Sequence, residues 1–118
     1  MTTSKMCTRM QSKDPSDWIS WYYFNMRIIA IDPGYERLGI AVLEKNKKEE
    51  LLFSECFKTK ASLLFIERLE LIGRKIESVI KEFKPEALAI ENLFISTNQK
   101  TAMRVAEVRG AILYQARI

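Results

Sequence analysis

Apolar residues from position 26 onward fall into short blocks separated by polar residues. Three of these blocks are rich in β-branched or aromatic residues and are typical of β-strands; they span 27–31, 38–43 and 51–57. The sequence Asp-Pro-Gly at 32–34 separates the first two blocks and is a strong turn signal. A charged run at 44–50 separates the second block from the third. The pattern therefore predicts an antiparallel meander over 27–57.

Apolar residues further along the chain recur at spacings of three and four, which is typical of an amphipathic helix. The residues that carry this period are Phe65, Ile66, Leu69, Ile72, Ile76, Val79, Ile80 and Phe83. We expect Ser62 to cap this helix and Pro85 to stop it. A short buried strand follows at 87–90, and a second helix is predicted from Thr97 to about residue 116.

The predicted order of elements is βββαβα, which places the chain in the α/β class with a mixed sheet. A strand that is reached through a helical crossover normally runs parallel to its neighbour in the sheet. The second helix is apolar on most sides, so we expect it to be buried or to form an interface with a partner. Ala102, Ala106 and Gly110 lie four residues apart and would let another helix approach closely.

Residues 1–25 differ from the rest of the chain. The first part is polar and aperiodic, and residues 18–24 (WISWYYF) form an aromatic cluster. This cluster is too short and too aromatic for the apolar core of a secretory signal. We interpret 1–25 as an unstructured or aromatic-rich N-terminal extension outside the fold, and 26–118 as the single folded domain.

The composition restricts the chemistry that the chain can perform. No histidine occurs among the 118 residues, which excludes histidine-based triads and most zinc sites. Two cysteines without CxxC spacing favour a reducing cytoplasm over a disulfide framework. The 19 basic and 15 acidic side chains give a net charge of +4, which is compatible with binding nucleic acid but does not require it.

Two acidic residues follow predicted strands directly: Asp32 comes after the first strand and Glu91 after the fourth. If these strands are parallel neighbours, both carboxylates lie at the carboxyl edge of the sheet, where open α/β sheets place their sites. Carboxylates without histidine suit Mg²⁺, and two such ions about 4 Å apart can promote phosphodiester hydrolysis. Each acid also has a structural interpretation: Asp32 could stabilise its own turn, and Glu91 the start of the next helix.

The motifs around these acids resemble the RuvC family of Holliday junction endonucleases. Residues 31–34 (IDPG) with Gly39 resemble the opening of that family, and 89–94 (AIENLF) with Asn98 and 109–110 resemble its second block. The resemblance runs from residue 26 to the end of the chain. Phosphate-binding proteins of the actin type begin similarly, but bulky residues follow the Asp-Pro-Gly sequence here in place of their small hydroxyl residues.

The resemblance implies an RNase H-like fold and a homodimer, formed through the second helix, that nicks two opposed strands of a four-way DNA junction. Asp32 and Glu91 match two metal-binding catalytic acids of the family, which implies Mg²⁺ as cofactor, with two ions per active site in a complete protein. Branch-migration proteins of the same recombination and repair pathway are further implied partners.

The resemblance also implies DNA-binding roles for four residues of the second block. Phe94 matches an aromatic residue expected to wedge against junction bases, and Asn98, Lys100 and Arg104 are expected to contact the phosphate backbone. From the sequence alone, Phe94 could equally be the exposed end of a core strand. The other three residues could equally form a solvated helix face.

One departure from the family leaves the function open. The family has a further strand and a last helix with two more acids, whereas no aspartate follows Asp32 here and Glu107 is a poor substitute. We therefore expect a C-terminally truncated resolvase whose fourth strand has an exposed edge. The alternatives are a non-catalytic module for junction binding or dimerisation, and a phosphate-binding fold of the actin type.

Overall fold

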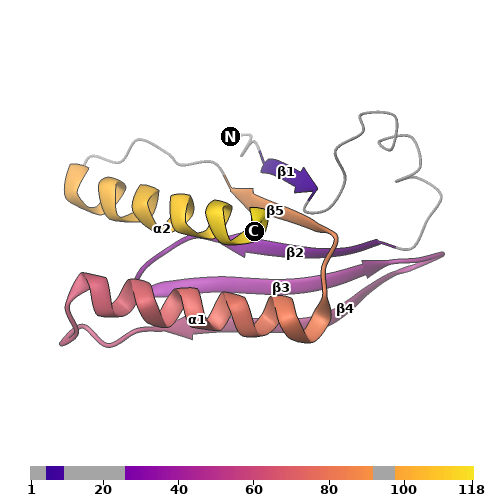
Figure 1. Cartoon of the computed structure of the whole chain (residues 1–118), viewed down its shortest axis with the longest axis horizontal. Coiled ribbons are helices and arrows are strands. Elements are labelled where there is room, and N and C mark those ends of the chain that lie inside the picture. The colour runs from indigo at the N-terminus through magenta and orange to yellow at the C-terminus, as the bar shows by residue number, and fades with distance from the viewer. Residues whose placement is uncertain (1–4, 10–25, 92–97) are drawn as a thin grey trace.

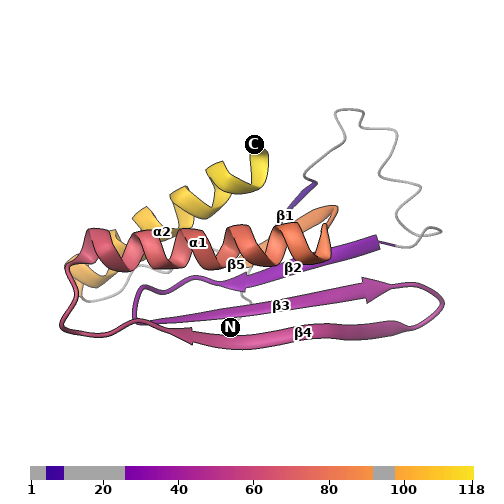
Figure 2. The same ribbon diagram turned by 60° about the horizontal axis from the view of Figure 1, so that its bottom comes forward.

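A five-stranded mixed sheet with two helices on one of its faces forms the structure (Figures 1 and 2). The computed structural model describes residues 5–9, 26–91 and 98–118. The strands are β1 (Lys5–Arg9), β2 (Met26–Asp32), β3 (Arg37–Lys45), β4 (Glu49–Lys58) and β5 (Ala87–Glu91), and the helices are α1 (Phe65–Phe83) and α2 (Gln99–Arg117). Neither helix is apolar enough over its length to cross a membrane, as far as the described residues show.

The order of elements from Met26 onward confirms the predicted βββαβα arrangement. β2, β3 and β4 form the antiparallel meander, and β5 lies beside β2 in parallel, as expected for a strand that follows a helical crossover. The strands are longer than predicted at the hairpin tip. Lys45 pairs there with Glu49, so much of the charged run continues the ladder and leaves only 46–48 for the turn.

The N-terminal strand corrects one part of the prediction that 1–25 lies outside the fold, because residues 5–9 belong to the sheet. β1 pairs antiparallel with β5, from Lys5 beside Glu91 to Arg9 beside Ala87. The expected exposed edge of β5 is therefore covered along this stretch. An edge strand offers a row of unpaired backbone groups that any short extended segment can satisfy, so β1 needs no apolar periodicity of its own. The aromatic cluster at 18–24 lies outside the described residues.

The ends of α1 also correct a prediction. Ser62 does not cap this helix, because 61–63 form a turn and Leu64 takes the N-cap position. The Glu67 carboxylate accepts a hydrogen bond of 2.9 Å from the Leu64 backbone N–H. At the other end, Lys84 adopts a left-handed conformation with φ 48°, immediately before the proline that was expected to stop the helix.

The core lies between the helices and one face of the sheet. Alternate residues of the strands are buried there against α1 and α2; they are Ile29, Ile31, Leu38, Ile40, Val42, Leu88 and Ile90. Gln115 of α2 donates a hydrogen bond of 2.8 Å to the Gly73 carbonyl of α1 and joins the two helices. Helix α2 buries only Val108, Ile112 and Ala116, so within the described chain it is covered on one side only.

Candidate functional site

The two candidate acids lie at the ends of neighbouring parallel strands. The β2–β5 ladder runs up to the pair Ile31 and Ile90, and Asp32 and Glu91 are the next residue of each strand. Side chains alternate between the faces of a sheet, so the burial of Ile31 and Ile90 beneath the helices directs both carboxylates to the opposite face. Asp32 is exposed and Glu91 is half-buried. The arrangement that the sequence predicts for this pair is therefore present.

The sheet face that carries these acids is hollowed. An open pocket of about 410 Å³ is lined by Asp32 and Glu91 at the carboxyl ends of β2 and β5. The other residues on this face that line it are small: Ala30, Gly39, Ala41, Ser54, Cys56 and Ala89. Because no bulky side chain from these strands fills the space, the pocket gives a ligand direct access to both carboxylates.

Two glycines shape the turn and strand beside Asp32. A Cβ atom on Gly39 would lie 3.2 Å from the Asp32 Cβ, so the Asp32 side chain packs closely over this glycine. A Cβ atom on Gly34 would lie 2.3 Å from the Arg37 carbonyl oxygen, which no side chain can accommodate without a backbone shift. The turn after Asp32 therefore requires glycine at position 34, whereas a side chain at position 39 in β3 would press on the Asp32 side chain.

The backbone of Glu91 is held in place by Arg109, a residue of the second motif identified in the sequence. Arg109 of α2 donates a hydrogen bond of 3.1 Å from Nε to the Glu91 backbone carbonyl. This contact ties the end of β5 to α2. The sequence indicated a packing role for 109–110, but it gave no sign that Arg109 reaches the backbone of the acidic residue itself.

A cluster of rings and guanidinium groups holds the turn that follows Asp32. The Tyr35 ring lies 5.5 Å from the guanidinium of Arg68 and 5.5 Å from that of Arg104. Phe65 contacts Tyr35 edge-on with centroids 5.7 Å apart, and Arg104 lies 5.2 Å from the Phe65 centroid. Such contacts each contribute about 0.5–2 kcal/mol. They join the turn to α1 and α2.

The sequence analysis did not predict this cluster, although the sequence contains one indication of it. Arg68 lies on the apolar face of α1, three residues after Phe65 and four before Ile72. A charged residue in such a stripe needs a partner. Arg68 is 5 % exposed, donates from Nε to the Lys60 carbonyl at 2.8 Å and approaches the Glu36 carboxylate at 3.9 Å.

Three of the four predicted DNA-binding residues, Asn98, Lys100 and Arg104, do not line the pocket that holds the two carboxylates. Asn98 caps α2, its Oδ1 accepting a hydrogen bond of 3.2 Å from the Thr101 N–H, and Lys100 is exposed on the first turn. Arg104 packs against the two rings described above. Phe94 and Thr97, where α2 was expected to begin, lie outside the described residues. DNA contact by these side chains remains a prediction.

Comparison with known proteins identifies the family. The family model for crossover junction endodeoxyribonuclease RuvC matches residues 28–117. The RuvC proteins of Thermosipho melanesiensis and Brachyspira hyodysenteriae are 45% and 40% identical over 89 residues, covering 75% of this chain in each case. A solved structure of Thermus thermophilus RuvC superposes with a TM-score of 0.67 at 34% identity, covering 77% of this chain and 57% of that one.

A second solved structure, T. thermophilus RuvC in complex with a Holliday junction substrate, has a TM-score of 0.71 at 33% identity. It covers 77% of this chain and 56% of the other. The two curated relatives are likewise covered over 57% and 56% of their length, so the chain spans little more than half of the proteins it matches. These matches confirm the α/β, RNase H-like fold. The chain belongs to the RuvC family of crossover junction endodeoxyribonucleases.

Proposed function

We propose that this chain acts as a Holliday junction resolvase, a Mg²⁺-dependent endonuclease that nicks two opposed strands of a four-way DNA junction in recombination and repair. The observation that carries the proposal is the placement of Asp32 and Glu91 at adjacent strand ends on one open face. Membership of the RuvC family and the likeness to a RuvC structure with a junction substrate support it. A DNA substrate also agrees with the cytoplasmic location expected from the cysteines.

The donor set fits a magnesium ion. Mg²⁺ is usually held by one or two carboxylates, with water and substrate phosphate oxygens completing its shell. Asp32 and Glu91 would provide those carboxylates. Among the residues that the structure describes, no group of three or more acidic or cysteine ligands occurs, so Asp32 and Glu91 are the candidate protein ligands at this edge of the sheet. A bound ion would stabilise charge developing on the scissile phosphate and lower the pKa of a nearby water.

The protein's own part in this reaction is to position these groups. The ring cluster around Tyr35 fixes the turn after Asp32, and Arg109 fixes the backbone of Glu91. The small residues of the hollow leave room for a DNA strand to reach the carboxylates. Such preorganisation matters because small displacements of reacting groups cost large factors in rate.

Symmetric cleavage of two strands needs two sites, and we propose that a homodimer formed through α2 provides them. Ala106 and Gly110 are exposed on this helix, and a Cβ atom on Gly110 would meet nothing within 4 Å in the described chain. Met103 and Tyr114 expose 64% and 68% of their surface. This exposure supports the partner interface over the alternative that α2 is buried within its own chain.

The assay that tests this function uses a four-way junction labelled on each strand in turn. We expect the chain to nick a pair of opposed strands in Mg²⁺, to leave a linear duplex of the same sequence intact, and to stop when the metal is chelated. Restoring Mg²⁺ should restore nicking. Selective junction binding without nicking would instead favour the non-catalytic binding module, because only two candidate acids meet in the described structure. Absence of both activities would contradict the proposal.

A further inference from the structure

Two cations face each other on the β3–β4 hairpin close to the site. Arg37 and Lys58 are directly opposed in the antiparallel ladder, and both are exposed. Like charges in this position repel and destabilise a sheet. Within the described chain, neither side chain takes part in an ion pair. Glu36 lines the same surface pocket as both cations, but its ion pair is with Arg68, so among the described residues no ion pair offsets the repulsion.

At the opposite end of the same hairpin, positive and negative side chains lie close to one another. Glu44 and Glu50 are also opposed like charges, but Arg27 contacts the Glu44 carboxylate at 3.1 Å. The next pair, Lys45 and Glu49, joins opposite charges. Among the opposed like-charge pairs of this hairpin, the one beside the site therefore has no ion-pair partner in the described chain.

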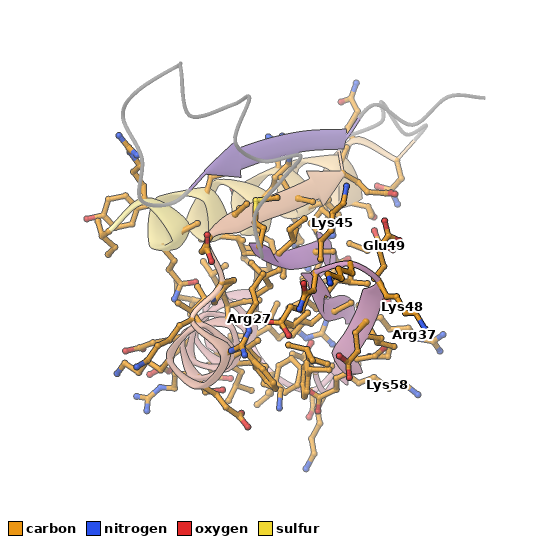
Figure 3. All side chains as sticks on the ribbon, turned by 90° about the vertical axis from the view of Figure 1, so that its right-hand side faces the viewer. Arg27, Arg37, Lys45, Lys48, Glu49 and Lys58 are labelled. Carbon is orange, nitrogen blue, oxygen red and sulfur yellow. The ribbon has the colours of Figure 1, made fainter. Side chains whose placement is uncertain are left out.

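The cation pair lies on the face that carries the candidate acids. Gly39 is opposed to Asp32 on one side and to Cys56 on the other. Arg37 and Lys58 are each two residues from this row, and since side chains alternate they share the face of Asp32. They lie about 7 Å from Asp32 along the strands and about 5 Å and about 10 Å from it across the sheet, because they are one and two strands away. In Figure 3 these two residues lie on the side away from α1, whereas Arg27 lies toward α1.

We propose that Arg37 and Lys58 together bind one backbone phosphate of the DNA strand, next to the phosphate that is cut at Asp32 and Glu91. The inference rests on the proposed function. Arg37 can bind a phosphate through two parallel N–H donors, and Lys58 adds a point charge. A phosphate between them removes their mutual repulsion. Contacts of this kind fix the register of the strand without reading its sequence, so they position the scissile bond over the carboxylates.

The test compares two double variants of equal charge. Arg37→Gln with Lys58→Gln removes the cation pair, and Lys47→Gln with Lys48→Gln removes two exposed lysines from the hairpin tip. The dissociation constant for a four-way junction is measured by fluorescence anisotropy over a series of salt concentrations, without divalent metal. Each phosphate contact contributes about 0.9 to the slope of log K against log salt, so loss of the one phosphate that the two cations share should reduce the slope by about 0.9. The Lys47/Lys48 variant should show the same slope of log K against log salt as the chain without substitutions.

An unchanged slope in the Arg37/Lys58 variant would overturn the inference, as would an equal reduction in the two variants, which would show an effect of net charge alone. A chain that binds no DNA would overturn it too. The proposed function fails separately: binding of linear duplex as tightly as of the junction would contradict it, even if the slope still depended on Arg37 and Lys58. Thermal unfolding checks the fold, and removal of a repulsive exposed pair should not lower the melting temperature.

Discussion

Replacing Asp32 by asparagine is expected to lower the rate of Mg²⁺-dependent junction nicking at least about 100-fold. Losing a residue that only hydrogen-bonds to a metal ligand already costs up to about 100-fold in activity, and Asp32 is proposed as a ligand itself. Asparagine keeps the shape of the side chain but removes the negative charge that holds the ion. Within the described residues the Asp32 carboxylate makes no hydrogen bond or ion pair, and it is exposed. The stability of the chain should therefore change by no more than about 0.5 kcal/mol. Initial nicking rates and thermal unfolding measure the two effects.

The matched control for this substitution is Glu82→Gln. Glu82 is an exposed carboxylate near the end of α1, away from both the pocket and α2, and its removal changes the net charge by the same amount. We expect it to leave the nicking rate unchanged. If Asp32→Asn cut junctions at the normal rate, or if both substitutions slowed the reaction equally, the assignment of Asp32 to the metal site would be wrong.

Ile76→Ala is expected to reduce the free energy of unfolding by about 2–5 kcal/mol, because it removes a fully packed side chain and leaves a cavity. Ile76 is 1% exposed and lies in the core between α1 and the sheet. Ile66→Ala makes the same chemical change in the same helix at a position that is 67% exposed, and should change stability by no more than about 0.5 kcal/mol.

Urea denaturation of the two variants gives both free energies. Because helix propensity changes in the same direction in both, the difference between them reports burial alone. Equal losses of stability would mean that α1 does not pack against the sheet in the orientation described.

The order of strands and helices could be predicted because each element carries its own signal. The β-branched run before Asp32 and the apolar stripe from Phe65 to Phe83 fix the period locally. The placement of Asp32 beside Glu91 then follows from the parallel crossover rule, without any knowledge of side-chain contacts. The positions of residues that depend on backbone topology alone could therefore be predicted from the sequence.

Features that depend on contacts between distant segments were not predictable in the same way. β1 is polar, and what places it is the unpaired edge of β5, more than 75 residues away along the chain. The contact of Arg104 with Tyr35 and Phe65 joins three separate elements, and the sequence pattern gave no indication of it. The start of α1 at Phe65 depends on Glu67 bonding back to Leu64, a cap without the usual polar residue.

Affinity for Mn²⁺, a paramagnetic substitute for Mg²⁺, tests the central claim most directly, since it requires no cleavage. Electron paramagnetic resonance counts the free ion in titrations of the unchanged chain, Asp32→Asn, Glu91→Gln and the double variant. If the two carboxylates hold one ion together, each single substitution should remove most of the affinity, and the double variant should bind little more weakly than either. Free-energy losses that simply add, as they do for independent sites, or an affinity that neither substitution changes, would contradict a shared metal site at the ends of β2 and β5.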